Sequence, residues 1–267
     1  MSSTQPYALV TGASRGIGKA IAKELAARQY NLLLVSVDEP TLRAAAFGLK
    51  QEFPTLDIRY FAQDLSAHGA VGAIKEWSAP FRSSLNVVVN NAGFGLTGRF
   101  EELSVEEQLN MIDVNFKALV ALSHAFIPIL TQSSAKKAYL LNVASTTAYQ
   151  SVPYLSVYTA TKAAVLSFSR SIRHELSGSK VSVSVVSPGS TDTNFVQRAR
   201  MGEEVKKLAE KVNMTPEEVA KIAVAGLFQG KAEIVPGFLN VLNAFLPRLV
   251  PKILVEKIAG NIYKPKG

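Results

Sequence analysis

The chain has 267 residues, of which 48% are hydrophobic and 19% charged, a composition that suits one large domain with a buried core and argues against disorder. The absence of cysteine excludes disulfides, thiolate nucleophiles and cysteine-bound metals. The 29 basic residues outnumber the 21 acidic ones, for a formal charge of +8, but they are scattered without a basic run, so nothing points to nucleic-acid binding.

The N-terminal segment leads almost directly into an apolar run, without the basic stretch and apolar core that signal peptides carry. We therefore expect a cytoplasmic protein. The longest uncharged stretch near the C-terminus, residues 234–247, is too short to span a bilayer.

Short apolar runs alternate with amphipathic segments, a pattern typical of βαβ units and a parallel sheet. We predict strands at residues 7–10, 31–37, 57–61, 85–89, 138–143, 181–186 and 232–235. We predict helices at residues 17–28, 41–52, 70–77, 105–130 and 156–176, and a later one that begins at the capping-box sequence of Thr215, Pro216 and Glu218. The pattern predicts a single doubly wound, Rossmann-like α/β domain of about seven parallel strands flanked by helices, in which residues 195–267 form a substrate-side lid and a C-terminal extension.

A glycine-rich turn joins the first predicted strand to its helix. Its sequence is Thr11-Gly12-Ala13-Ser14-Arg15-Gly16-Ile17-Gly18. Glycines let the backbone turn sharply and approach a diphosphate without a Cβ clash, and the following helix offers unpaired N–H groups at a positive dipole end. Because this turn lies between a predicted strand and a predicted helix, it indicates nucleotide binding rather than a tight turn alone.

Tyr158 and Lys162 are four residues apart on a predicted helix, so both project from one face. A phenol with a pKa of about 10 is a poor proton donor or acceptor at neutral pH, and a neighbouring ammonium is expected to lower that pKa. Ser145 follows the fifth predicted strand, and its hydroxyl can hydrogen-bond a substrate oxygen as charge develops there. The three residues indicate acid/base chemistry on an oxygen-bearing substrate.

In their order along the chain, these motifs resemble those of the short-chain dehydrogenase/reductase family. The glycine spacing is Thr-Gly-x-x-x-Gly-x-Gly, and the segment from Tyr158 to Lys162 reads Tyr-x-x-x-Lys. The resemblance spans residues 5–195 and includes Asp64-Leu65, Asn90-Asn91-Ala92-Gly93, Asn115, Ser145 thirteen residues before Tyr158, and Pro188-Gly189 followed by Thr193. It implies an NAD(P)-dependent oxidoreductase with a Rossmann-like fold.

The resemblance also implies a role for each residue. The catalytic group would be Asn115, Ser145, Tyr158 and Lys162: Tyr158 as acid/base, Lys162 bonding the nicotinamide ribose, and Asn115 holding a relay water, stabilising a helix kink, or both. The cofactor would be bound by Gly12, Ser14, Arg15, Gly16, Ile17, Gly18, Ser36, Asp64, Leu65, Asn91, Ala92, Gly93, Tyr158, Lys162, Pro188, Gly189, Thr191 and Thr193. Hydride transfer from the nicotinamide to a carbonyl needs no metal, and the three histidines (His68, His124 and His174) show no ligand spacing.

Two other functions fit the same scaffold. A non-catalytic nucleotide-sensing regulator typically keeps the glycine turn but loses the Tyr/Lys pair, and this chain keeps both. An isomerase or epimerase with a retained nicotinamide more often carries Thr-Gly-x-x-Gly-x-x-Gly. The residues therefore favour an oxidoreductase.

The end of the second predicted strand bears on the choice between NADP and NAD. An acid there would bind the ribose hydroxyls and repel a 2′-phosphate, but the aligned residue is Ser36. Arg15 resembles the basic residue of NADP-preferring members, whereas Val37 stands where many of them have arginine and Asp38 adds a negative charge. The balance favours NADP(H), with NAD(H) as the alternative.

The C-terminal segment 236–260 is strongly apolar. It fits a cap over the substrate pocket or a subunit contact, simple core packing, or a peripheral membrane helix whose Arg248, Lys252 and Lys257 face anionic lipid. Each arrangement borders the pocket with apolar groups, so we expect a medium or large apolar carbonyl or alcohol as substrate. Further lining residues are expected to be Phe94, Tyr149 and Tyr154.

We also expect a homodimer or homotetramer. The predicted helix 156–176 carries a stripe of small and apolar residues suited to close approach by a symmetry mate, namely Val157, Ala160, Ala164 and Phe168. Family members commonly associate through this helix and the one at 105–130, and the resemblance implies the same contact here.

Overall fold

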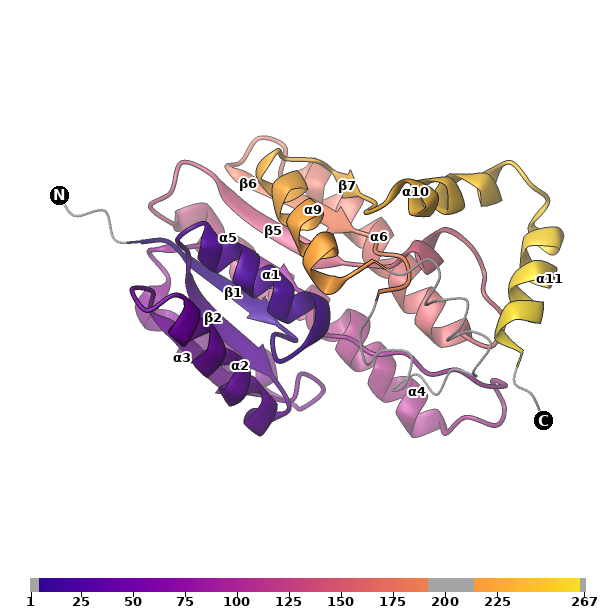
Figure 1. The fold of residues 1–267 in the computed structure, drawn as a ribbon, viewed down its shortest axis with the longest axis horizontal. Coiled ribbons are helices and arrows are strands. Elements are labelled where there is room, and N and C mark those ends of the chain that lie inside the picture. The colour runs from indigo at the N-terminus through magenta and orange to yellow at the C-terminus, as the bar shows by residue number, and fades with distance from the viewer. Residues whose placement is uncertain (1–4, 192–213, 265–267) are drawn as a thin grey trace.

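The computed structural model describes residues 5–191 and 214–264, which form a seven-stranded sheet covered by helices on both faces (Figure 1). Neighbouring strands pair in parallel, in the order β3-β2-β1-β4-β5-β6-β7. The strands are β1 (Tyr7–Thr11), β2 (Asn31–Ser36), β3 (Ile58–Ala62), β4 (Leu85–Asn90), β5 (Ala138–Val143), β6 (Val181–Val186) and β7 (Glu233–Ile234). The predicted doubly wound fold class is confirmed, and the apolar runs mark each strand to within one residue.

The order of the strands places a crevice at one edge of the sheet. From β1 the chain moves outward to β2 and β3, then returns to β4 on the other side of β1. The connections that follow β1 and β4 therefore leave toward opposite faces of the sheet, and the space between them lies at the carboxyl ends of the strands. Ligands of open parallel sheets bind at this position.

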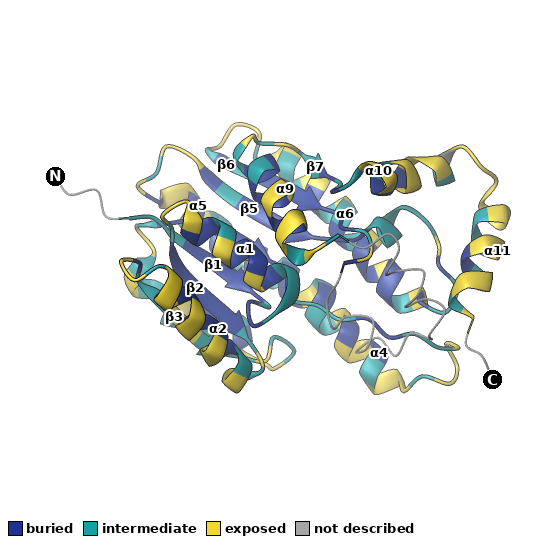
Figure 2. Cartoon of the chain, viewed as in Figure 1, coloured by how far each residue is buried: buried dark blue, intermediate teal, exposed yellow. Residues whose placement is uncertain are grey.

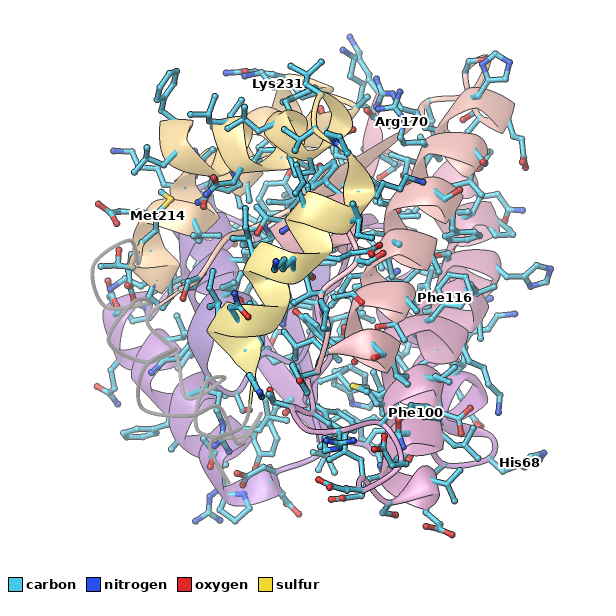
Figure 3. All side chains as sticks on the ribbon, turned by 90° about the vertical axis from the view of Figure 1, so that its right-hand side faces the viewer. His68, Phe100, Phe116, Arg170, Met214 and Lys231 are labelled. Carbon is cyan, nitrogen blue, oxygen red and sulfur yellow. The ribbon has the colours of Figure 1, made fainter. Side chains whose placement is uncertain are left out.

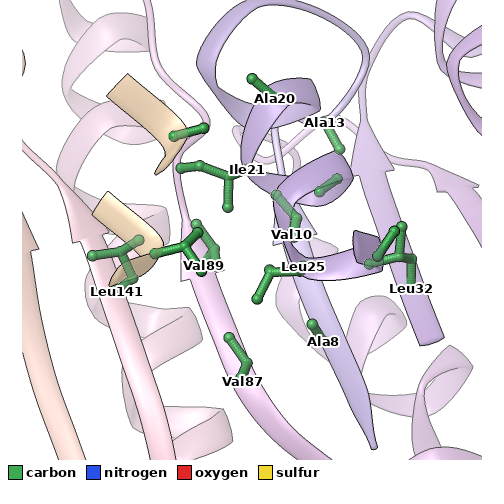
Figure 4. Close-up of a cluster of buried hydrophobic side chains, with 14 of the residues drawn as sticks. Ala8, Val10, Ala13, Ala20, Ile21, Leu25, Leu32, Val87, Val89 and Leu141 are labelled. Carbon is green, nitrogen blue, oxygen red and sulfur yellow. The ribbon is translucent and has the colours of Figure 1, made fainter. Parts of the chain in front are cut away.

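Helices bury the two faces of the sheet separately. One face is covered by α1 (Gly16–Ala27), α2 (Glu39–Glu52) and α9 (Pro216–Phe228), and the other by α3 (Ala70–Trp77), α5 (Ala118–Gln132) and α6 (Ser156–Glu175). Figure 4 shows the first face, where Ile21 and Leu25 of α1 meet Val10 and Val89 of the sheet. All four side chains are fully buried, so this packing fixes the start of α1 against the end of β1.

The predicted helix at 105–130 is interrupted in the structure. It consists of α4 (Val105–Ile112), one π-turn at Asp113–Lys117, and α5. By length and apolar composition alone the segment Val105–Gln132 could cross a membrane. Its apolar side packs against the sheet, however, where Phe126 and Leu130 are fully buried. Single π-turns of this kind often occur at functional sites, and this one contains Asn115.

The segment expected to be a lid divides into two parts in the structure. Its beginning lies outside the described residues, and α9 with β7 belongs to the layers of the sheet, since α9 packs along α1. The predicted capping box of α9 is present, with Thr215 and Glu218 bonded to each other's backbone N–H groups. In the described part of this segment, α10 (Phe238–Phe245) and α11 (Lys252–Tyr263) extend beyond the sheet, on the right of Figure 1.

Candidate functional site

The turn between β1 and α1 has a backbone that only glycine accommodates. Gly12 and Gly16 have φ angles of +65° and +55°, in the left-handed region that L side chains avoid. A Cβ at Gly18 would lie 2.3 Å from the carbonyl oxygen of Gly12, so the first turn of α1 can approach the strand end only as glycine. The backbone of this turn is therefore bare and accessible to a ligand.

Hydrogen bonds tie the glycine turn to the end of β4. The Thr11 hydroxyl accepts from the backbone N–H groups of Asn91 and Ala92 at 3.1 and 3.2 Å. The Asn91 side-chain amide donates to the carbonyl oxygens of Thr11 and Gly12 at 2.9 and 3.2 Å. These bonds hold the two sides of the crevice at a fixed separation and account for the asparagine at position 91.

Among the described residues, no side chain caps the N-terminus of α1. The N-cap residue Arg15 makes no side-chain capping bond, and the first turn of the helix carries no acidic residue. The first N–H groups of α1 thus lack a side-chain partner at this end and point, with the positive end of the dipole, toward the crevice. Beside them, the hydroxyls of Ser14 and Ser36 are 3.0 Å apart. Bare backbone, hydroxyl donors and an uncapped helix together fit the diphosphate of a dinucleotide.

Arg15 forms an ion pair with Asp38 at the end of β2. The Asp38 carboxylate also caps α2, where it accepts from the Thr41 hydroxyl at 2.7 Å and from the Thr41 N–H at 3.2 Å. The hydrogen bond from the Thr41 hydroxyl is the largest cause of a lowered pKa at Asp38, and Arg15 adds to it. The arginine expected to meet a 2′-phosphate therefore lies beside a carboxylate that balances part of its charge.

Tyr158, Lys162 and Ser145 come together in the interior of the molecule. Tyr158 and Lys162 lie one turn apart on α6 and are both buried, and the Tyr158 hydroxyl is hydrogen-bonded to the Ser145 side chain. The ammonium of Lys162 donates to the Val143 carbonyl oxygen at 3.0 Å and lies 5.7 Å from the centre of the Tyr158 ring. The predicted helical spacing thus places all three polar groups in one small volume.

Burial dominates the proton affinities of this pair. It raises the pKa of the Tyr158 hydroxyl above its ordinary value, against the smaller lowering effect of the Ser145 hydrogen bond. It lowers the pKa of Lys162 to about 8. The expected net lowering of the Tyr158 pKa is therefore wrong for this structure, because desolvation of the phenolate outweighs its attraction to the nearby ammonium. The ammonium is bonded to the end of β5 and faces the ring, while desolvation disfavours the phenolate.

Asn115 lies behind this group. Its side-chain oxygen accepts from the Phe94 N–H at 2.9 Å, and its amide donates to the Phe94 carbonyl oxygen at 2.8 Å and to the Thr161 hydroxyl at 3.2 Å. A Cβ at Gly93 would lie 2.9 Å from the Asn115 oxygen and 3.4 Å from the Lys162 nitrogen. Asn115 thus fixes the π-turn against the end of β4, in agreement with a role in stabilising a helix kink. That it also holds a relay water stays a prediction.

A cavity of about 890 Å³ runs from the glycine turn past Tyr158 to α10 and α11. Its volume is at the upper end of the range for small-molecule sites. Most of the residues predicted for the site line it, namely Gly12, Ser14, Arg15, Gly16, Ile17, Gly18, Ser36, Asp64, Leu65, Asn91, Ala92, Gly93, Ser145, Tyr158, Lys162, Pro188, Gly189 and Thr191. Thr193 lies outside the described residues.

The structure also corrects the expected lining. Phe94 faces the cavity, but Tyr149 and Tyr154 do not line it. The Tyr149 hydroxyl donates instead to Glu233 at 2.5 Å, on the neighbouring strand β7.

Asn240 of α10 is a lining residue that the sequence analysis missed. It is buried and donates to the Pro236 carbonyl oxygen at 2.7 Å, and a Cβ at Gly189 would lie 2.1 Å from its oxygen. Two asparagines within the apolar run 238–246, Asn240 and Asn243, were the available signal, and both line the cavity.

Comparisons with known proteins agree with this geometry. The family model for short chain dehydrogenases matches residues 6–204. An uncharacterized oxidoreductase, DltE of Bacillus subtilis strain 168, is 33% identical over 265 residues, which cover 96% of this chain and all of that protein.

Two solved structures are similar over nearly the full length. A short-chain dehydrogenase from Sphingobium yanoikuyae in complex with NADPH has a TM-score of 0.79 and 26% identity, covering 98% of this chain and 96% of its own. A bulky-bulky ketone specific alcohol dehydrogenase from Comamonas testosteroni has a TM-score of 0.74 and 25% identity, covering 98% and 95%. Together with the glycine turn and the Tyr158–Lys162 pair, these matches show that the chain belongs to the short-chain dehydrogenase/reductase family of nicotinamide-dependent oxidoreductases.

Proposed function

We propose that the protein interconverts a carbonyl and an alcohol on a medium or large apolar substrate, with Tyr158 as the acid/base and NADP(H) as the preferred cofactor. The observation that carries this proposal is the position of Tyr158. Its buried hydroxyl, bonded to Ser145, lies where the glycine-turn part of the cavity meets the part lined by α10 and α11. A hydride carrier held by the turn and a substrate held by the helices would meet at this hydroxyl.

A bound reduced nicotinamide dinucleotide would supply the hydride. The chain's own residues supply the rest: the glycine turn and the uncapped start of α1 hold the diphosphate, and Tyr158 gives its proton to the carbonyl oxygen. The Ser145 hydroxyl lies within hydrogen-bonding reach of Tyr158 and can donate to the same oxygen as negative charge develops. One hydride and one proton convert the carbonyl to the alcohol, and the reverse steps oxidise it.

The proton affinities favour Tyr158 as a proton donor. Its raised pKa keeps the hydroxyl protonated at neutral pH, so the proton is available for a carbonyl. With a pKa of about 8, Lys162 carries its charge at neutral pH and lies 5.7 Å from the ring, where it stabilises the phenolate that forms. At neutral pH both groups are therefore in the protonation state that reduction of a carbonyl requires.

Three features support NADP(H) over NAD(H). Arg15 lies at the end of β2, the residue that aligns with the NAD-selecting acid is the uncharged Ser36, and a relative in complex with NADPH shares the fold. Asp38 acts in the opposite direction because its carboxylate already pairs with Arg15. A 2′-phosphate would have to compete with that carboxylate for the guanidinium.

The far part of the cavity supports an apolar substrate. Its walls from the C-terminal helices are mainly aliphatic, namely Leu246, Val250, Val255, Ile258, Ala259 and Ile262. The similar ketone-specific enzyme is described as acting on bulky-bulky ketones, which agrees with a wide apolar site. We infer that the substrate carries apolar groups on one or both sides of the reacting carbon.

The test is Tyr158→Phe, assayed for NADPH-dependent reduction of a panel of apolar ketones. The substitution keeps the ring and its packing but removes the proton donor, so turnover should fall by about 10²–10⁴-fold. Binding of NADPH, followed by fluorescence titration, should stay within a few-fold of wild type. Turnover within tenfold of wild type would refute the acid/base role. A wild-type protein that binds NADPH and reduces no carbonyl in the panel would favour a nucleotide sensor.

A further inference from the structure

The C-terminal helices carry an unusually large exposed apolar surface. Phe238 on α10, Leu249 between the helices and Ile253 on α11 are 81%, 84% and 73% exposed, although none of them lines the cavity. Figure 2 shows exposed residues along both helices, and in Figure 3 α11 crosses the face turned to the viewer. The other outward apolar residues are Leu239, Leu242, Phe245 and Leu254. Many exposed apolar side chains gathered on two consecutive helices mark an interaction site.

Basic residues accompany this apolar surface. Residues 238–264 contain four basic residues and one acidic residue. On α11, the exposed Lys257 is four residues after Ile253, so the two side chains share the outward face of the helix, and a second exposed lysine, Lys264, follows directly after its last residue. The acidic residue, Glu256, is half-buried. Lysines beside exposed aliphatic groups are the pattern of a helix that lies on an anionic membrane, with the ammonium groups at the headgroups.

The mouth of the cavity is continuous with this surface. Four side chains line the cavity and are also exposed to solvent, namely Leu246, Val250, Ile258 and Ile262. The inner sides of α10 and α11 thus form the apolar wall of the cavity. The outer sides of the same two helices form the apolar surface around its opening. A lipophilic compound could pass from a bilayer under this surface into the cavity without crossing water.

We propose that the α10–α11 surface binds an anionic lipid membrane and presents the mouth of the cavity to it. The protein lies on the membrane at this surface, with the sheet in solution. A second copy of this chain fits less well, because a two-fold contact would bring the basic residues of both copies into one interface, with one acidic residue for every four basic ones in the segment. An anionic bilayer instead complements both the apolar groups and the charge. Delivery of substrate from the bilayer rests on the function proposed above, whereas membrane binding does not.

The test is sedimentation of the purified full chain with vesicles, in the absence of substrate. Wild type should sediment with phosphatidylcholine vesicles that contain 30% phosphatidylserine, and much less with phosphatidylcholine alone. Leu249→Glu and Ile253→Glu should each lower the partition coefficient tenfold or more, because burial of one such side chain contributes at least about that factor. Replacing both Lys257 and Lys264 with glutamine should lower it about 25-fold at low salt, or about fivefold for each charge near the surface.

Phe47→Glu is the matched control, since Phe47 is 66% exposed on α2, a different part of the surface. It should sediment like wild type, and circular dichroism should show that each variant is folded. Equal sedimentation of the Leu249→Glu variant and wild type, or no sedimentation of wild type, would overturn the proposal. So would light scattering in which Leu249→Glu dissociates an oligomer while vesicle binding is absent, because the surface would then be a contact between copies.

Turnover separates this inference from the proposed function. Leu249→Glu lies outside the cavity, so reduction of a water-soluble ketone should be unchanged while reduction of a long-chain ketone carried in anionic vesicles should fall. If neither ketone is reduced by wild type, the proposed function fails while the sedimentation result stands. If both ketones are reduced equally by wild type and variant, substrate does not enter from the bilayer.

Discussion

Lys162 connects the stability of this protein to its chemistry. Its ammonium is buried beside Tyr158, with one hydrogen bond to the Val143 carbonyl oxygen, and burial lowers its pKa from 10.5 to about 8. Folding therefore has to bury a positive charge at neutral pH. The perturbation that exposes this cost is Lys162→Met, which keeps an unbranched apolar chain of similar length and removes the charge.

The sign of the pH effect follows from the two pKa values. Below pH 8 the lysine is protonated in both the folded and the unfolded chain, and the folded state bears the full cost of the buried charge. Between pH 8 and 10.5 the unfolded chain binds more protons at this site than the folded chain, so the free energy of unfolding of wild type rises with pH. At about 1.4 kcal/mol per pKa unit, the whole relief is about 3 kcal/mol, and about 2 kcal/mol of it is reached between pH 7 and pH 9.5.

The assay is urea denaturation of wild type and Lys162→Met at pH 7.0, 8.0, 8.8 and 9.5. The stability of the variant minus that of wild type should be largest at pH 7 and fall by about 2 kcal/mol by pH 9.5, while other titrating groups cancel in the difference. Lys75→Met, which removes an exposed lysine from α3, serves as the control for loss of one positive charge. Parallel curves for wild type and Lys162→Met would refute the argument that burial sets this pKa. The variant should also lose turnover, because no ammonium remains to stabilise the Tyr158 phenolate.

Three further predictions concern the cofactor, the assembly and the fold. Arg15→Ala should reduce the preference for NADPH over NADH, by up to about 1.5–3 kcal/mol of charge-assisted bonding, whereas Asp38→Asn should increase that preference. Equilibrium titration with each cofactor measures both effects. An unchanged preference in Arg15→Ala would mean that another group binds the phosphate. Light scattering should show a dimer or tetramer, since Ala160 of the α6 stripe is exposed, and a monomer at micromolar concentration would contradict this. Thr215→Ala should lower the free energy of unfolding by about 1 kcal/mol through loss of the capping box. A loss below roughly 0.3 kcal/mol, which is close to the error of the measurement, would contradict it.

Local pattern was sufficient for the sheet and for most of the site. Strands buried on both faces appear as continuous apolar runs, and a glycine turn between such a run and a helix places bare backbone at a known edge of the sheet. Tyr158 and Lys162 are four residues apart, so they share one face of their helix whatever the helix packs against. These properties depend on neighbours in the sequence, so the sequence by itself determined the fold class and identified most of the residues that line the cavity.

Other properties depend on which distant groups meet, and only the tertiary structure decided them. The pKa of Tyr158 is raised because the surrounding chain excludes water, and the sequence showed only the nearby lysine. The pairing of Arg15 with Asp38 requires the β1–α1 turn to reach the end of β2. The apolar C-terminal run favoured a cap or a subunit contact but also fitted core packing or a membrane surface. In the structure α10 and α11 turn one side to the cavity and leave the other in solvent, because burial is a property of the packed molecule and not of the residue.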